Sequence, residues 1–356
     1  MRKTILARFF STCIALSLCF SLTGCGDKQD TTSGNVLKIY NWGEYIDEDI
    51  ITEFEAETGI DVIYDTFTTN EEMYAKISAD PSLYDVICPS DYMIAKLIEN
   101  NLLSPINWNN VPNIANIGET YMDRVSEFDP GNQYTVPYTW GTVGILYNTK
   151  MITEPVDSWD ILWDENYKNN IIMQDSVRDA FAVALKKLNY SLNATDPEQL
   201  KEAQQLLQQQ YPLVKAYAID EVRDKMINNA AALGVIYSGE YLFCKEENPD
   251  LAYVVPKEGS NLWFDGWVIT SASKNKENAE KWLDFLCRPD IAYRNFEYIT
   301  YATPNTAAME MIDSDIRNDN GVFPDEETLS RCEIFKFLGQ EVEDYYYELW
   351  KLVKYK

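Results

Sequence analysis

The sequence predicts an α/β protein built on a mainly parallel β-sheet. The chain has 356 residues, enough for more than one domain, and 46% of them are hydrophobic, as in globular proteins. From Val36 onward, short apolar segments alternate with amphipathic ones. Strands separated by helices indicate βαβ units, and such sheets bind ligands beyond the carboxyl ends of their strands. The pattern fits one or two domains and does not fix the strand order.

The N-terminus has the layout of a secretory leader. Basic residues precede a short apolar run that ends in "LTGC", with the cysteine at Cys25. The motif resembles a bacterial lipobox, which implies cleavage after Gly24 and lipidation of Cys25. The alternative is an ordinary signal peptide with a chance cysteine. We expect a leader over 1–24, a flexible polar tether over 25–35 and no later transmembrane segment.

The first third of the chain predicts three strands and three helices. "VLKIY" is a strand, and Asp47 is suited to cap the helix that follows. Gly59 is suited to end that helix before a second strand over 60–64. Asn70 is suited to cap the next helix, and "YDVICPS" and "DYMIAKLIENNLL" follow as a strand and a helix.

The later segments continue the same alternation. "QYTVPYTWGTVGILYN" predicts two adjacent strands interrupted at 138–141. Helical spacing covers Val177–Lys187 and Pro197–Gln210. "AALGVIYSG" predicts a strand, "LAYVVPKEGSNLWFDGWVITSAS" two more, and "NKENAEKWLDFLCRP" and the C-terminal "EVEDYYYELWKLVKYK" predict helices.

The composition excludes several function classes. With 57 acidic and 30 basic residues, the net charge of −27 repels nucleic acid and anionic lipid, and either favours cationic partners or serves solubility. The chain has no histidine, which excludes Ser-His-Asp and Cys-His catalysis and the commonest metal ligand. Outside the leader and lipobox, the cysteines show no zinc spacing and lie in apolar contexts. We expect buried free thiols, with one disulfide left open, at Cys88, Cys244, Cys287 and Cys332.

Five strand or helix ends combine carboxylates with aromatic or small polar residues. They are "NWGEY", "PSDY", "QDSVRD", "YSGEY" and "WFDGW". Singly, such residues pack in cores or cap helices; if they converge, they form a cleft with aromatic walls and acidic points. Aromatic faces attract ammonium groups, and carboxylates supply the charge-assisted hydrogen bonds that desolvated ammonium requires. An alkyl chain with amines along it, a polyamine, would satisfy all of these groups.

Longer motifs resemble the bacterial spermidine/putrescine-binding proteins, extracytoplasmic receptors of ABC importers. They include "YNWGEYI", "YDVICPSDYMI", "VVPKEGSNLWFDGW" and "YATPNTAA", within a similarity over 36–308. The resemblance implies a two-lobed periplasmic-binding-protein-like fold of type II, with the ligand between the lobes and crossover strands near 138–141 and 263–265. It places one lobe at 36–139 plus 264–308 and the other at 140–263 plus 309–356.

The resemblance also implies a set of ligand-binding residues. They are Trp42, Glu44, Tyr45, Ser90, Tyr92, Asp179, Tyr237, Trp263, Asp265 and Tyr301. The chain departs from the spermidine-binding pattern in having Gly43 for a threonine, Ser176 for an aspartate beside Asp175, Tyr237 for a tryptophan, and Phe335 for a glutamine. The departures leave the choice between putrescine and spermidine open.

We therefore expect a monomeric receptor outside the membrane, held to it only through Cys25, that delivers a polyamine to an ABC permease. Its location would be the outer face of a Gram-positive membrane or the periplasm. We expect no catalytic residue, cofactor, metal or nucleic acid. The alternatives are a receptor of the same fold for another organic cation and a glycoside hydrolase that uses an acid pair.

Overall fold

Residues 35–219 and 221–355 are described by a computed structural model, and the leader and Cys25 lie outside them. The strands are β1 (Val36–Trp42), β2 (Asp61–Phe67), β3 (Val86–Ile87), β4 (Leu103–Ser104), β5 (Thr135–Asn148), β6 (Ile171–Gln174), β7 (Val214–Ala218), β8 (Leu233–Tyr237), β9 (Leu251–Val254) and β10 (Leu262–Thr270). The helices are α1 (Glu48–Thr58), α2 (Asn70–Ala79), α3 (Asp91–Glu99), α4 (Glu119–Val125), α5 (Val177–Lys187), α6 (Pro197–Gln210), α7 (Glu221–Ile227), α8 (Ser238–Glu247), α9 (Lys276–Leu286), α10 (Pro289–Ile299), α11 (Thr306–Met309), α12 (Ser314–Arg317), α13 (Glu326–Leu329) and α14 (Gln340–Lys354).

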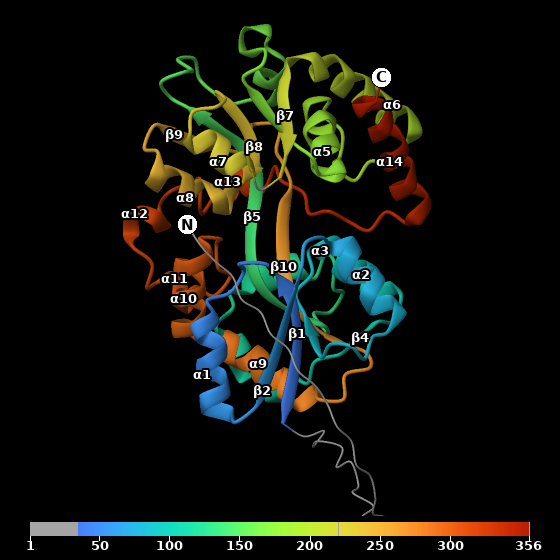
Figure 1. Ribbon diagram of the computed structural model, residues 1–356, viewed down its shortest axis with the longest axis vertical. Helices are drawn as coiled ribbons and strands as arrows, with labels where there is room; N and C mark the ends of the chain where they lie inside the picture. The colour runs from blue at the N-terminus through green and yellow to red at the C-terminus, as the bar shows by residue number, and fades with distance from the viewer. Residues whose placement is uncertain (1–34, 220, 356) are drawn as a thin grey trace, which may run out of the picture. The chain divides into compact units, whose positions relative to one another are not determined.

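Two long strands, β5 and β10, connect two lobes (Figure 1). The strand order is β2-β1-β3-β10-β5-β8-β6-β7, with β4 beside β10 and β9 beside β5. Pairing is parallel around β1 in one lobe and around β6 in the other. The antiparallel strands β5 and β10 pair with each other from one lobe toward the other. This arrangement confirms the predicted α/β class and its two crossover strands, while the exact lobe bounds stay a prediction.

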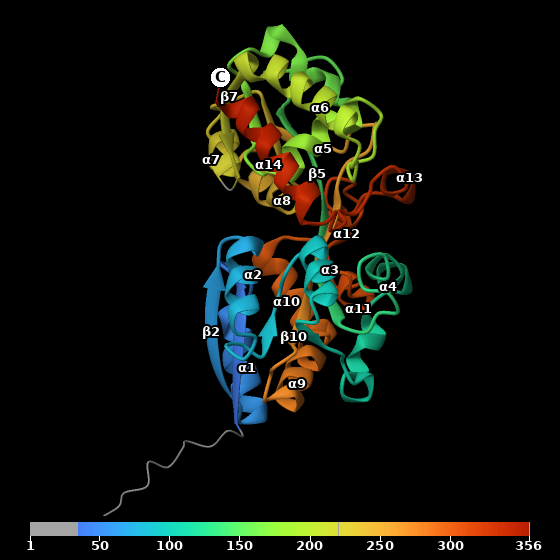
Figure 2. The same cartoon turned by 90° about the vertical axis from the view of Figure 1, so that its right-hand side faces the viewer.

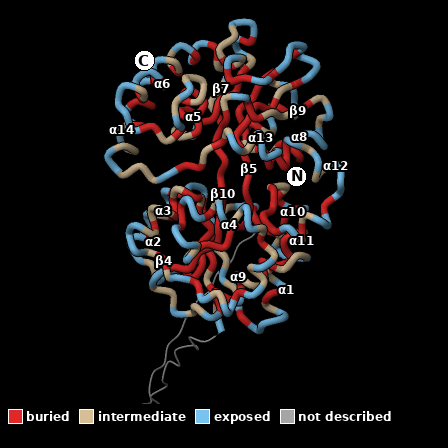
Figure 3. Tube along the Cα trace, turned by 180° about the vertical axis from the view of Figure 1, so that it is seen from behind, coloured by how far each residue is buried: buried red, intermediate tan, exposed pale blue. Residues whose placement is uncertain are grey.

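The helices cover the two parts of the sheet separately. α1, α2, α3 and α9 lie with β1 and β2, whereas α5, α6, α7 and α8 lie with β7 and β8 (Figure 1). The C-terminal helix α14 packs against α5 and α6, as the turned view also shows (Figure 2). Buried positions follow β5 and β10 through the middle of the molecule (Figure 3).

The predicted interruption at 138–141 is wrong, because β5 is continuous through it. Gly141 pairs with Trp263 in the β5–β10 ladder, so it forms no turn. A Cβ atom on Gly141 would lie 2.6 Å from both the Ser238 hydroxyl and the Trp263 ring. The glycine therefore serves a close approach between neighbouring elements.

The predicted cap at Asn70 is also wrong, since Thr69 caps α2 by accepting the Glu72 amide hydrogen. The caps predicted for α1 are confirmed. The Asp47 carboxylate accepts from the amide of Asp49, and Gly59 ends the helix with a left-handed φ of 66°. Asn70, the first residue of α2, is buried, and its side chain is directed toward the candidate site described below.

The predicted buried thiols are confirmed. The free, buried cysteines are Cys88, Cys244, Cys287 and Cys332. In the part of the chain that the structure describes, every helix is too short or too polar to span a bilayer.

Candidate functional site

Three predicted residues, Tyr45, Ser90 and Asp265, meet where β10 enters the first lobe. The Tyr45 hydroxyl donates to Asp265 Oδ2 at 2.7 Å, and it lies 2.5 Å from the hydroxyl of Thr139 on β5. Ser90, before α3, forms an isolated β-bridge with Asp265 and also hydrogen-bonds its carboxylate. Residues distant in sequence thus surround one carboxylate.

The Asp265 carboxylate is poised to bind a cation. Its side chain is buried, with 7% exposure. Burial raises its pKa to about 6, although hydrogen bonds from Ser90 and Tyr45 favour the charged form. At neutral pH Asp265 is therefore an incompletely solvated anion, which a ligand ammonium would stabilise.

A second buried carboxylate, Asp179, lies in the other lobe in the first turn of α5. Its Oδ2 accepts from the Tyr237 hydroxyl at 2.9 Å, and its Oδ1 accepts from the Asn261 amide at 3.4 Å. Burial raises the pKa of Asp179, and hydrogen bonds from Ser176, Tyr237 and Asn261 oppose that rise. This site resembles that of Asp265: a buried acid held by neutral donors.

The acid next to Ser176 does not replace the aspartate that the resemblance expects there. Ser176 caps α5 by accepting from the Asp179 amide. Asp175 instead forms an ion pair with Lys354 of α14 at 2.7 Å. The departure at Ser176 thus removes a carboxylate from this end of the site.

Aromatic rings join the two buried acids. The Tyr301 ring lies edge-on to Tyr45, with centroids 5.7 Å apart, and to Trp263, with centroids 5.3 Å apart. Trp263 in turn lies edge-on to Tyr237 at 6.1 Å. A Cβ atom on Gly239 would overlap the Tyr301 ring, so glycine there permits the contact. We call this run of four rings, Tyr45, Tyr301, Trp263 and Tyr237, the aromatic run.

Ser90 and Tyr92 are connected through Asn70. The Asn70 amide nitrogen lies 3.1 Å from each of their hydroxyl oxygens. The Tyr92 hydroxyl also donates to Glu71 at 3.1 Å. Tyr92 packs against a cluster of the other lobe that contains Phe335, the residue that replaces the expected glutamine. This contact supplies an apolar surface where the resemblance expects an amide.

Two predicted residues, Trp42 and Glu44, take no part in the hydrogen bonds and ring contacts described above. Trp42 packs on Phe67, with ring centroids 4.5 Å apart. Glu44 is exposed and has a left-handed φ of 52°, a conformation that costs free energy in a residue with a side chain. Within residues 35–219 and 221–355, neither side chain makes a hydrogen bond or ring contact with the other eight.

Several functional candidates were missed from the sequence. Thr139, Asn70 and Asn261 contact the site through polar side chains that are nearly or fully buried. Asp91, the carboxylate of the "PSDY" end noted in the sequence, is also buried and accepts the Phe264 amide at 3.0 Å, which fixes the strand between Trp263 and Asp265. Burial raises the pKa of Asp91, and backbone hydrogen bonds oppose that rise.

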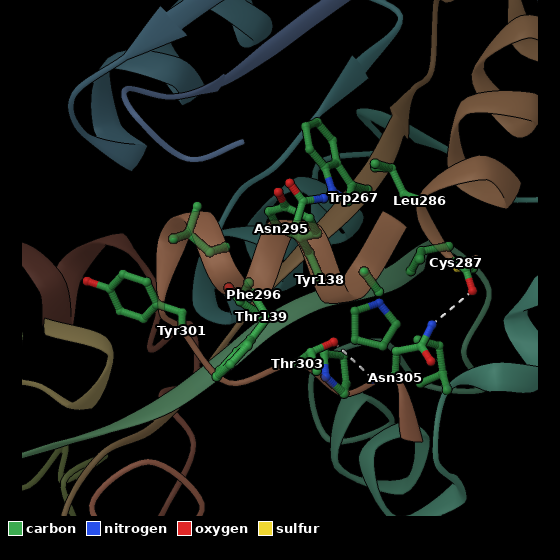
Figure 4. Close-up of a pocket in the computed structure, with 16 residues that line it drawn as sticks. Tyr138, Thr139, Trp267, Leu286, Cys287, Asn295, Phe296, Tyr301, Thr303 and Asn305 are labelled. Atoms are coloured by element: carbon green, nitrogen blue, oxygen red, sulfur yellow. Dashed lines mark hydrogen bonds between the residues drawn. The ribbon is translucent and has the colours of Figure 1, made fainter. Parts of the chain in front are cut away.

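A small cavity is lined by Thr139, Tyr301 and neighbouring residues of the first lobe (Figure 4). Its volume of about 20 Å³ would hold one water molecule and excludes an organic ligand. Asn305 closes part of its wall by donating to the carbonyl of Cys287 at 2.9 Å. The described residues contain no group of three or more potential metal-ligating side chains.

The two-lobed fold and the buried acids define a class of protein, and comparison with known families identifies that class. Residues 49–324 match the model of the bacterial extracellular solute-binding proteins, and the chain belongs to that family. Members of this class bind solutes and are not enzymes, in agreement with the expectation from the sequence.

Individual similar proteins narrow the family resemblance to proteins named for spermidine or putrescine. A spermidine/putrescine-binding periplasmic protein of Salmonella typhimurium is 35% identical over 323 residues, which cover 89% of this chain and 92% of the relative. The putrescine-binding periplasmic protein SpuD of Pseudomonas aeruginosa is 30% identical over 367 residues, covering 98% and 99%. The solved structure of a putative spermidine/putrescine ABC transporter from Listeria monocytogenes superposes with a TM-score of 0.85 at 42% identity, over 90% of this chain and 99% of that one.

Proposed function

We propose that this protein is an extracytoplasmic receptor that binds a polyamine, putrescine or spermidine, between its lobes. One observation carries the proposal: two buried carboxylates, Asp179 and Asp265, stand at the ends of the aromatic run. Ammonium groups pair with such carboxylates, and the methylenes between them pack on aromatic rings. The names of the relatives support the same ligand class.

Binding would draw the lobes together and present the closed form to an ABC permease. A ligand shifts such an equilibrium only through contacts that differ between the open and closed states. Asp265 and Tyr45 belong to one side of the site, and Asp179 and Tyr237 to the other. A diamine or triamine that spans them would therefore favour closure, a hinge motion on β5 and β10.

The proposal includes a monomer held at the membrane by lipid on Cys25, with the lobes bounded as the resemblance implies. The lipobox sequence "LTGC" supports the anchor. Cys25→Ser should move the expressed chain from the membrane fraction to the soluble fraction. An unchanged distribution would contradict the anchor and leave the binding function untouched.

Mass spectrometry of small molecules that copurify with the natively expressed protein tests the ligand class. We expect the mass of putrescine, spermidine or a closely related amine, at up to one molecule per chain. Another organic cation at that stoichiometry would replace the polyamine with a different ligand of the same fold.

A further inference from the structure

A third carboxylate, Glu240, borders the aromatic run. It lies in the first turn of α8, directly after Gly239, which contacts the Tyr301 ring. Glu240 Oε1 accepts from the Tyr301 hydroxyl at 3.0 Å. The Tyr301 ring itself contacts Tyr45 and Trp263. Glu240 is thus one hydrogen bond from the rings that lie between the two buried acids.

Glu240 differs from those acids because it forms an ion pair with a cation of the protein, whereas Asp179 feels Arg178 only at longer range. Arg223 of α7 places Nη1 at 3.3 Å from Glu240 Oε2, and the two side chains are 35% and 19% exposed. The Arg223 guanidinium lies 4.9 Å from the Phe243 ring, which holds it against α8. By contrast, Asp179 and Asp265 are held by neutral hydroxyl and amide donors.

A partly buried carboxylate that already has a guanidinium partner gains less from a ligand ammonium than one held by neutral donors. The incoming ammonium would meet a neutralised pair and would be repelled by the arginine. The number of ammonium groups that a site binds favourably depends on how many of its carboxylates are not already paired with a cation of the protein. By pairing with Glu240, Arg223 therefore lowers the number of ligand ammonium groups that the site binds favourably.

We propose that Arg223 is a specificity-determining residue, a fixed counter-cation for Glu240 that disfavours an additional ligand ammonium and so shifts selectivity from triamines toward diamines. This inference rests on the polyamine function proposed above. It assigns to Arg223 no contact with the ligand; the residue acts through Glu240 and the Tyr301 hydroxyl.

Competitive calorimetry with putrescine and spermidine tests the inference on the full chain and on Arg223→Gln. The glutamine variant should raise the ratio of spermidine to putrescine affinity about tenfold, as expected for one recovered charge-assisted hydrogen bond. Arg223→Lys, which keeps the charge, should leave the ratio near that of the wild type. A folded Arg223→Gln variant with the wild-type ratio would overturn the inference.

Two further variants guard against indirect effects. Arg317→Gln breaks an exposed ion pair with Glu310 and should leave the ratio unchanged, whereas the same rise there would refute a role specific to Arg223. If Arg223→Gln does not fold, Glu240→Gln serves instead, because it removes the carboxylate at 3.3 Å and leaves Arg223 paired only with the exposed Asp224, at 3.6 Å. The ratio should then fall, and an unchanged ratio would overturn the inference. Wild-type protein that binds neither amine would refute the proposed function itself, a result distinct from an unaltered ratio.

Discussion

Asp265→Asn should stabilise the ligand-free protein and weaken polyamine binding at the same time. Burial raises the Asp265 pKa from 3.8 to about 6, so above pH 6 the folded chain holds a charge that the unfolded chain solvates better. A pKa raised from 3.8 to about 6 corresponds to about 3 kcal/mol of folding free energy lost on ionisation. Asparagine removes that charge and keeps an oxygen for the Tyr45 hydroxyl, which donates to the carboxylate at 2.7 Å in the wild type.

The sign of the pH dependence follows from the raised pKa. The folded state binds the proton more tightly than the unfolded state, so ionisation of Asp265 costs stability as pH rises through the range from about 4 to 6. The advantage of the asparagine variant should be complete near pH 7.5, at several degrees of melting temperature, and should vanish below about pH 4. Wild-type affinity should fall on acidification through pH 6, because a protonated carboxyl offers an ammonium no charge.

The affinity of Asp265→Asn should fall by more than tenfold at pH 7.5, since removing one partner of a buried charge pair costs roughly 2–5 kcal/mol. Thermal melts of the ligand-free proteins at several pH values and calorimetry with putrescine and spermidine measure both effects. Asp61→Asn, at an exposed carboxylate on β2, is the matched control and should change neither. A lower melting temperature for Asp265→Asn at pH 7.5 with unchanged affinity would refute the reasoning.

Two other substitutions test the geometry. Gly239→Ala should weaken polyamine binding by about tenfold because its Cβ would displace the Tyr301 ring, whereas Gly43→Ala, with open space around the added atom, should have little effect in the same titration; equal effects would contradict the model of the aromatic run. Lys96→Met should weaken binding severalfold, because Lys96 of α3 lies 3.4 Å from Glu343 of α14 across the two lobes, with each side chain 12% exposed. Faster ligand release in stopped-flow fluorescence should accompany that loss, and an unchanged release rate would remove the pair from closure.

Local patterns predicted much of the fold. The bounds of α5 and α6 agree with the helical spacing, and the caps at Asp47 and Gly59 are present, because caps and periodicity depend on neighbouring residues. The continuity of β5 could not be predicted this way. In the sequence, Gly141 is typical of a turn, and only the structure shows that Trp263 and Ser238 pack against it.

In the candidate site too, local sequence patterns predicted some residues, whereas contacts between distant parts of the chain were not predictable. The recurrence of acids beside aromatic or small polar residues pointed to Asp179, Asp265 and three rings of the aromatic run, and the family resemblance added the fourth ring, Tyr301. The structure brings these residues together. The partners Asn70 and Asn261 could not be predicted, since their contacts join residues far apart in the chain. The pairing of Asp175 with Lys354 likewise depends on where the last helix packs.

Calorimetric titration of the ligand-free chain with putrescine, spermidine and spermine tests the central claim most directly. We predict saturable binding of one molecule per chain at micromolar concentrations or below for at least one of them, with weaker binding at pH 5 than at pH 7.5. The absence of binding by all three amines at these concentrations would contradict the assignment of Asp179, Asp265 and the aromatic run to a polyamine site.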